Sequence, residues 1–255
     1  MSTLCILTCH NFQPEVQACI RSQGWPDVQS AGFASRCGRP PVEWDELRAA
    51  IAPDCSQVVI LGRACLAKLG AVPAGFPPVR IEVQEQCFHL IAGKALVEQA
   101  LEEGSYLMTP AWLRDWRRHV RELGFPPEQA SEFFQGFAKK LAFLDTGIDT
   151  QTTAHLADNA ATLNLPVQRI AVGCDHTTLL ISRIVQQWRL DTLKSETQAK
   201  ELHHARELAD HAMALDLLGR MTKSRDEAEV ITATEDLFRM LFAPTSWHYI
   251  AAQAN

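Results

Sequence analysis

The chain has 255 residues, with 24 Lys and Arg against 30 Asp and Glu, a net charge of -6 and 47% hydrophobic residues. This composition is that of a globular protein and excludes disordered, collagen-like and fibrous classes. The mild acidity gives no general attraction to nucleic acid or to an anionic membrane. The apolar runs are too short to span a bilayer and the N-terminus lacks a signal-peptide pattern, so we expect a cytoplasmic protein without nucleic-acid or membrane partners.

Up to about residue 190, short β-rich runs alternate with helical stretches. The predicted strands cover residues 4–8, 28–34, 57–62, 79–84, 105–108, 140–145 and 169–172. The predicted helical stretches cover residues 14–23, 42–51, 64–69, 88–102, 110–123, 127–137, 151–163 and 177–188. This alternation predicts an α/β fold with Rossmann-like parallel sheets, and the similar rhythm of its two halves is consistent with two related lobes.

The composition changes after residue 190. Residues 191–225 contain no Pro and many Ala, Leu, Glu and Lys, which predicts one long helix at the C-terminal end of the α/β fold. Residues 226–241 resemble a further helix and residues 246–251 a further strand. We therefore expect three segments: a cysteine-containing α/β sensory domain (1–190), a signalling helix (191–225) and the start of a truncated domain (226–255). This organisation indicates a fragment of a longer protein.

The long helix carries an imperfect seven-residue repeat. Leu208, Leu215 and Thr222 lie seven apart, and a row of small residues runs beside them: Ala205, Ala212 and Gly219. Such a repeat is typical of a coiled-coil contact, which would make the chain a homodimer through this helix. An ordinary amphipathic helix packed on its own chain explains the pattern equally well.

The chain has eight cysteines and no CxxC pair, so it lacks the local signature of zinc ribbons and thioredoxin-like proteins. In open α/β sheets, ligands bind beyond the carboxyl ends of the strands. The predicted strands bring five cysteines to this edge of the fold: Cys9, Cys37, Cys65, Cys87 and Cys174. We expect the other three, Cys5, Cys19 and Cys55, to be packing residues.

Thiolates at this edge suit a soft or borderline metal ion or an iron–sulfur cluster. His10 lies beside Cys9 and His89 follows Cys87 by two residues, so both are candidate cofactor-binding residues. The alternative is that the cysteines are small core residues, which is common for buried thiols.

Enzyme signatures are weak in comparison. There is no GxGxxG after the first strand, no Walker A loop and no GxSxG elbow. Asp145-Thr146-Gly147 is explained by a turn, and His176 by the start of a helix. We assign no catalytic residue and do not expect this fragment to be an enzyme.

Three short motifs indicate a family. They are Gln86-Cys87-Phe88-His89-Leu90-Ile91-Ala92-Gly93, Gly104-Ser105-Tyr106-Leu107-Met108-Thr109-Pro110-Ala111-Trp112 and Leu144-Asp145-Thr146-Gly147. Over about residues 4–188 the chain resembles the domain of unknown function 1638 family. The resemblance implies conserved family cysteines at Cys9, Cys37 and Cys87, and an association with corrinoid and methyl-transfer metabolism. The chain departs from the family pattern at Ala111, where glycine is usual, and after Cys37, where the glycine-rich run is short.

The tail from Ala205 to Ile250 resembles the opening of a sensory GAF domain, with Leu237-Phe238-Arg239-Met240-Leu241-Phe242-Ala243-Pro244 before a strand. This resemblance implies the N-terminal sensory part of a sensor histidine kinase in a two-component system. Kinase domains would then follow in the same polypeptide.

Three functional hypotheses follow. In the first, the α/β domain is a sensor that binds an iron–sulfur cluster or zinc through Cys9, Cys37 and Cys87, with Cys174 as a further metal ligand, and changes the long helix. In the second, the protein is an enzyme or accessory protein that acts on a corrinoid or a methylated small molecule. In the third, the domain binds an organic ligand without metal and its cysteines are structural.

Overall fold

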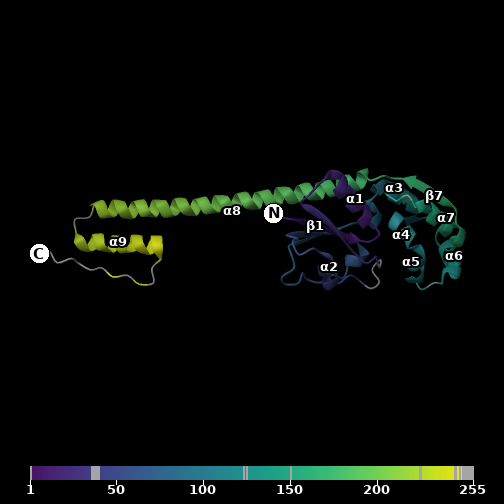
Figure 1. The fold of residues 1–255 in the computed structure, drawn as a ribbon, viewed down its shortest axis with the longest axis horizontal. Coiled ribbons are helices and arrows are strands. Elements are labelled where there is room, and N and C mark those ends of the chain that lie inside the picture. Colours follow the sequence, from purple (N-terminus) through teal and green to yellow (C-terminus); the bar gives the residue numbers. More distant parts are fainter. Residues whose placement is uncertain are drawn as a thin grey trace. The chain divides into compact units, whose positions relative to one another are not determined.

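The structure is a computed structural model that describes residues 2–35, 41–122, 124, 126–149, 151–223, 226–243, 246 and 248. The chain divides into two compact units, Met1–Trp188 and Arg189–Asn255. The first unit is a mixed α/β domain and the second is helical (Figure 1).

The first unit begins with a four-stranded parallel sheet. Its strands are β1 (Leu4–Cys9), β2 (Val28–Phe33), β3 (Gln57–Gly62) and β4 (Val79–Val83), in the order β2-β1-β3-β4. The connecting helices are α1 (Gln13–Gln23), α2 (Trp44–Ala50) and two short 3-10 turns, η1 (Ala64–Leu66) and η2 (Cys87–Leu90). The chain leaves β1 for β2 on one side and continues with β3 on the other. The carboxyl ends of β1 and β3 therefore form a topological switch point, where open α/β sheets bind their ligands.

A second parallel sheet follows, with the order β5-β6-β7. Its strands are β5 (Ser105–Met108), β6 (Lys140–Asp145) and β7 (Val167–Ala171). Its helices are α3 (Lys94–Glu102), α4 (Pro110–Arg114), α5 (Trp116–Glu122), α6 (Pro127–Gln135) and α7 (Thr152–Leu163). The prediction of an α/β fold with parallel sheets and a long C-terminal helix is confirmed.

Both sheets contribute one face to a common core. In β1, Leu4 and Ile6 belong to this core, whereas Cys5 and Leu7 belong to a second core on the α2 side, because successive strand residues point to opposite faces. Leu107 of β5 and Leu144 of β6 join the common core from the second sheet. The two sheets are thus packed around shared apolar side chains. Their inner strands β1, β3 and β6 are buried on both faces, as expected for parallel strands, whereas the edge strands β4 and β7 are partly exposed.

Several predicted helices differ in the structure, and that expected over 110–123 is divided into α4 and α5. The stretch expected over 88–102 is interrupted, because Gly93 is extended (φ -63°, ψ 148°) and serves as the N-cap of α3. The helices expected at 177–188 and 191–225 form one helix, α8 (Asp175–Lys223), because no Pro or Gly interrupts the chain between them. The first turns of α8 are buried in the common core through Ile181 and Ile184.

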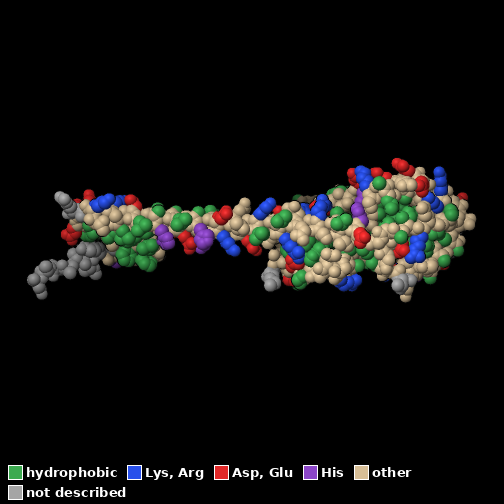
Figure 2. All heavy atoms as spheres, turned by 90° about the horizontal axis from the view of Figure 1, so that it is seen from above, with side chains coloured by type: hydrophobic (Ala, Val, Ile, Leu, Met, Phe, Trp, Pro, Cys, Tyr) green, Lys and Arg blue, Asp and Glu red, His purple; other side chains and the backbone are tan. Residues whose placement is uncertain are grey.

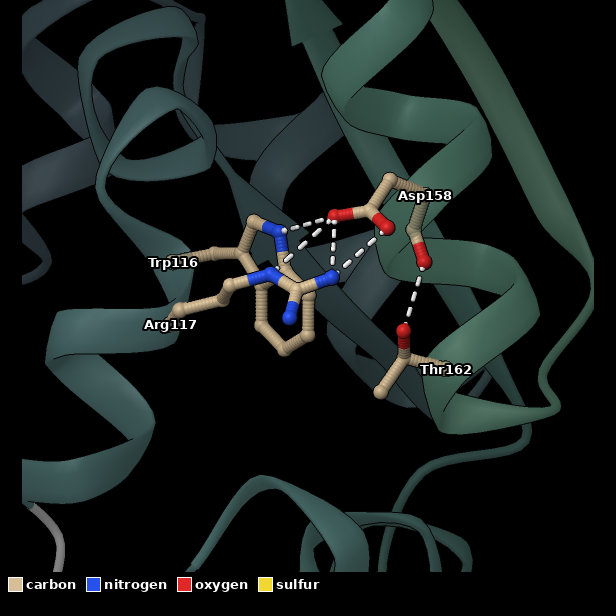
Figure 3. Close-up of polar contacts among 4 residues, drawn as sticks. All are labelled: Trp116, Arg117, Asp158 and Thr162. Atoms are coloured by element: carbon tan, nitrogen blue, oxygen red, sulfur yellow. Dashed lines mark hydrogen bonds and ion pairs between the residues drawn. The ribbon is translucent and has the colours of Figure 1, made fainter.

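A further packing contact joins α5 to α7 (Figure 3). The Asp158 carboxylate accepts a hydrogen bond from the buried Trp116 indole N–H at 3.3 Å and from the Arg117 guanidinium at 2.8 and 2.9 Å. The Asp158 backbone carbonyl accepts from the Thr162 hydroxyl at 2.9 Å. The Asp158 carboxylate therefore accepts hydrogen bonds from both the buried Trp116 indole and the exposed Arg117 guanidinium.

The second unit contains the remainder of α8 and α9 (Glu227–Phe242). Leu217 and Ala233 are buried, and the Thr234 hydroxyl lies 3.9 Å from the Met221 sulfur, so α9 packs on α8. Figure 2 shows hydrophobic side chains gathered on this helical pair. Most of the strand predicted at 246–251 lies outside the described residues.

The predicted heptad positions Leu208 and Leu215 are exposed, at 68% and 69%. A dimer through this face therefore stays a prediction. Within the described part of the chain, no helix combines the length and apolar character that crossing a membrane requires.

Candidate functional site

A cavity of about 670 Å³ lies in the first unit, between the carboxyl edge of the first sheet and the edge strand β5 of the second. Cavities that bind small molecules in proteins have volumes of about 300–1,000 Å³. The residues that line it come from both sheets and are Cys9, Asn11, Phe12, Ser35, Arg63, Ala64, Cys65, Gln86, Cys87, Phe88, Leu101, Gly104, Ser105, Tyr106, Leu107, Thr109, Trp112 and Phe137. We call it the central cavity.

Three cysteines line the central cavity from the first sheet. Cys9 is the last residue of β1, Cys65 lies in the η1 turn after β3, and Cys87 begins the η2 turn after β4. The switch point of the sheet therefore brings together side chains from three loops. We call Cys9, Cys65 and Cys87 the thiol wall.

The turn that carries Cys65 packs closely against Gly62. A Cβ atom at Gly62 would lie 2.9 Å from the Leu66 side chain and 3.3 Å from the Cys65 sulfur, so a larger residue there would require the Leu66 side chain to move. Burial raises the pKa of the Cys65 thiol, while nearby backbone N–H groups of the same turn act in the opposite direction. Cys65 is therefore a protonated thiol at neutral pH unless a cation stabilises its thiolate.

This pKa shift predicts the reactivity of Cys65. We expect Cys65 to be alkylated slowly by iodoacetamide near neutral pH. The alkylation rate should keep rising with pH beyond the ordinary pKa of a cysteine, because only the thiolate reacts. Peptide mass spectrometry of protein alkylated between about pH 7 and about pH 10 measures this rate at Cys65 alone. An alkylation rate that levels off below about pH 8 would show that burial does not raise the pKa of this thiol.

The opposite side of the central cavity is aromatic. Tyr106, Trp112 and Phe137 lie on this side, with Tyr106 edge-to-face at 5.3 Å from Trp112 and 6.0 Å from Phe137. We call these three residues the aromatic wall. Ser105 lies beside them and is 7% exposed, and its hydroxyl has no hydrogen-bond partner among the described residues. The Ser105 oxygen has almost no accessible surface, so this side chain would have to rotate toward the cavity before its hydroxyl could contact a ligand.

Hydrogen bonds join the two sides of the cavity. The Thr109 hydroxyl, which caps α4, donates to the Asn11 backbone carbonyl at 3.1 Å and accepts from the Trp112 backbone N–H at 3.1 Å. The Asn11 backbone N–H donates to the Ser35 hydroxyl at 2.9 Å. The loop after β1 is therefore tied to the second sheet, which holds Cys9 and Trp112 in one site.

The structure separates the residues predicted as ligands. Cys9 and Cys87 line the central cavity, whereas Cys37 lies outside the described residues. His10 and His89 do not belong to the cavity lining. His10 is exposed beside Gly32, and the His89 backbone carbonyl accepts a hydrogen bond from His176 Nε2 at 2.9 Å.

Cys174 also lies apart from the central cavity, with Cys19, Thr146 and Thr178. The Cys174 thiol is 3.6 Å from the Thr146 carbonyl oxygen, and the Thr178 hydroxyl is 3.2 Å from the Cys19 sulfur. The pKa of Cys174 is raised to about 11. The largest cause is burial, and the neighbouring Cys19 and Glu15 raise the pKa further. The α1 helix and the start of α8 thus hold two protonated thiols outside the cavity.

The same region contains a buried acid that the sequence analysis did not identify. Glu15 is 0% exposed; its Oε1 accepts from the Thr146 hydroxyl at 3.2 Å, and its Oε2 has no partner among the described residues. Burial raises the pKa of Glu15 to about 7, against the opposing effects of its own backbone, Thr146 and Arg114. No local sequence signal distinguishes Glu15 from an exposed first-turn glutamate, because its burial depends on contact with the second sheet.

The remaining cysteines are Cys5 and Cys55. Both are buried on the α2 side of the first sheet, as expected for packing residues, and their sulfurs are joined in a disulfide that the sequence analysis did not predict. Among the described residues, no group of three His, Cys, Asp or Glu side chains could hold a metal ion. The thiol wall is thus spread over the cavity surface and does not converge on a single ion.

The fold and the cavity define a two-sheet α/β protein with a cysteine-lined cavity at a switch point of its first sheet. The family model described as Protein of unknown function (DUF1638) matches residues 45–181, which is more than half of the chain. The chain therefore belongs to this family. The match includes Cys65, Cys87 and Cys174 and begins after Cys9 and Cys37. No curated protein and no solved structure matches the chain.

Proposed function

We propose that the α/β unit is a sensory or ligand-binding module that holds a metal-containing group at the thiol wall. The observation that carries this proposal is that Cys9, Cys65 and Cys87 line one cavity at the switch point of the first sheet. Cysteine thiolates are ligands for zinc and for iron–sulfur clusters, so these side chains are of the right chemical type for such a group. Among the described residues the three thiols do not converge on a single ion, so the proposal is for a cluster or a metal-containing cofactor, which can span separated ligands.

The protein side chains have defined tasks in this proposal. Cys65 would lose its proton on binding, because a thiol must be deprotonated to coordinate a metal. The apolar lining excludes water and strengthens the electrostatic interaction between thiolates and a cation. A bound iron–sulfur cluster would supply one-electron redox chemistry at a potential that this lining and its hydrogen bonds help to set.

The module would report its ligand through α8. The first turns of this helix are buried in the common core, and the same helix continues to Lys223 without interruption. A ligand shifts such a helix only if it binds two states of the domain with different affinities. Dimerisation through α8, the GAF-like start and the downstream kinase domains remain predictions from the sequence, as does the cytoplasmic location.

The test is metal analysis of protein purified without oxygen, together with its visible absorption spectrum. We expect near-stoichiometric metal in the unchanged protein and its loss in a variant with Cys9→Ala, Cys65→Ala and Cys87→Ala. The matched control changes two cysteines that lie away from the cavity, the buried Cys19 and the partly buried Cys174, in a Cys19→Ala and Cys174→Ala variant that is expected to keep the metal.

Two further results decide the details of this proposal. A Cys37→Ala variant tests the cysteine that was predicted from the sequence and that lies outside the described residues. Metal that is equally present in the triple variant and the unchanged protein, or absent from both, would refute binding at the thiol wall.

A second candidate is a protein that acts on a corrinoid or a methylated small molecule. The aromatic wall across the cavity from the cysteines favours it, because a methyl donor held between the two walls would lie against apolar rings and face a thiol. Protein that contains no metal but transfers a methyl group to one of the three cysteines would favour this candidate over the sensor.

A further inference from the structure

The aromatic wall points to a ligand that the thiol wall alone does not require. Five of the 18 residues that line the central cavity are aromatic, whereas aromatic residues make up 7% of the chain; they are Phe12, Phe88, Tyr106, Trp112 and Phe137. A metal centre bound by cysteines needs no such enrichment. Aromatic side chains offer ring faces and edges to planar apolar groups, which they bind by edge-to-face and offset contacts.

The polar groups of the cavity indicate where the ligand carries its polar atoms. The Ser105 hydroxyl is buried beside the aromatic wall, and it lacks a partner among the described residues. Leaving such a group unsatisfied is unfavourable, so rotation of the shielded Ser105 hydroxyl toward the cavity, where a ligand atom could hydrogen-bond to it, would improve binding. Arg63 is exposed and also lines the cavity, so it supplies a positive charge where the cavity meets solvent.

We propose that the central cavity binds a planar organic anion, with its ring against the aromatic wall, a polar atom at the Ser105 hydroxyl and its negative charge near Arg63. This inference rests on the proposed function only in using the same cavity. The organic anion would be the ligand that the module senses, or the organic part of its metal-containing group. The thiol wall lies on the other side of the cavity and is not needed to hold the ring.

The probe for this proposal is 2-naphthoate, a planar aromatic carboxylate, titrated into the full chain by calorimetry. We expect saturable binding with one site per chain. Ser105→Ala is expected to weaken binding about fivefold, because it removes one hydrogen bond. Ser105→Phe is expected to abolish binding by filling the cavity. The charge is tested with Arg63→Gln. This variant should bind 2-naphthoate more weakly than the unchanged protein does, but it should bind the neutral analogue 2-naphthamide with the same affinity as the unchanged protein.

Two controls separate this site from other apolar surfaces. Phe137→Leu alters the aromatic wall and is expected to weaken binding, whereas Phe242→Leu alters an exposed ring of the helical unit and should have no effect. If Ser105→Phe fails to fold, Ser105→Ala and Phe137→Leu still decide the outcome. Absence of saturable binding, or equal affinity in these two variants and the unchanged protein, would overturn the proposal.

The thiol-wall triple variant distinguishes this inference from the proposed function. Retained 2-naphthoate binding by that variant supports the ring site independently of metal. If the unchanged protein contains no metal but binds 2-naphthoate at Ser105 and Phe137, the metal proposal fails and the ring site stands. If metal is bound at the thiol wall but 2-naphthoate does not bind, the metal proposal stands and the ring site fails.

Discussion

Replacing Glu15 by Gln is expected to remove a pH-dependent loss of stability from the α/β unit. The pKa of Glu15 is raised to about 7 in the folded state, chiefly by burial, so folding takes up a proton between the unfolded and folded pKa values. The contribution of Glu15 to stability is therefore greatest below about pH 4.5, falls as the pH rises, and reaches a lower plateau above about pH 7. A shift of this size corresponds to about 3 kcal/mol.

The Glu15→Gln side chain keeps an oxygen acceptor for Thr146 but cannot ionise. It places an NH₂ group where Oε2 has no partner among the described residues, which offsets part of the gain. We therefore expect the variant to be more stable than the unchanged protein by about 1–3 kcal/mol at about pH 8, and by much less at about pH 5.

Denaturant unfolding at several pH values, followed by tryptophan fluorescence, measures this difference. Five of the six tryptophans lie within residues 1–188, so the signal reports on the α/β unit. Thr146→Val serves as the control, because it removes the hydrogen bond but leaves the buried carboxyl to titrate. Parallel stability curves for Glu15→Gln and the unchanged protein would show that Glu15 is not the group responsible.

Trp116→Ala is expected to cause the largest single loss of stability among these predictions. Trp116 is 2% exposed and belongs to the core between the second sheet and its outer helices. Truncating a buried Trp to Ala costs about 3–5 kcal/mol, because it removes apolar contacts and leaves a cavity. Its indole N–H also donates to Asp158, as Figure 3 shows.

Arg117 provides the matched control because it binds the same carboxylate from an exposed position. Its side chain is 56% exposed, and surface ion pairs contribute about 0–1 kcal/mol. Arg117→Ala should therefore lower the free energy of unfolding by about 1 kcal/mol or less. This small loss is expected although the Arg117 side chain makes more hydrogen bonds to Asp158 than Trp116 does. Trp116→Phe keeps a buried ring and separates the indole hydrogen bond from packing.

Thermal or denaturant unfolding of these three variants tests the ranking. We expect Trp116→Ala to be far more destabilising than Arg117→Ala, with Trp116→Phe in between. Equal losses for Trp116→Ala and Arg117→Ala would mean that the ion pair, and not the buried ring, holds α5 on α7.

The secondary structure was largely predictable from local pattern. The strands at 57–62, 105–108 and 140–145 match β3, β5 and β6, because buried strands form short apolar runs bounded by turn residues. The break before α3 was not predicted, because a glycine N-cap resembles a glycine within a helix until its backbone angles are known. The change of composition near residue 190 predicts a boundary between two helices, but α8 continues through it. A change of composition alone does not interrupt a helix.

The candidate site was predictable in part. Strand order in an α/β fold brings the residues after successive strands to one edge, which predicts five cysteines there: Cys9, Cys37, Cys65, Cys87 and Cys174. Of these, Cys9, Cys65 and Cys87 line the central cavity, Cys174 lies apart from it and Cys37 lies outside the described residues. The resemblance to the family favours Cys37 as a ligand and does not indicate Cys65. The placement of Cys174 depends on how the two sheets pack, and no local pattern contains that information.

The sequence by itself determined the α/β class, the parallel strands and the edge to which the cysteines come, because periodicity and chain connectivity are local properties. The packing of the second sheet against the first decided what lies opposite the thiol wall. It placed Ser105 and the aromatic wall across the cavity and buried the Glu15 carboxyl against Thr146. These contacts join residues about a hundred positions apart, and only tertiary structure brings them into the same low-dielectric surroundings. There the Ser105 hydroxyl lacks a partner among the described residues and burial raises the pKa of Glu15.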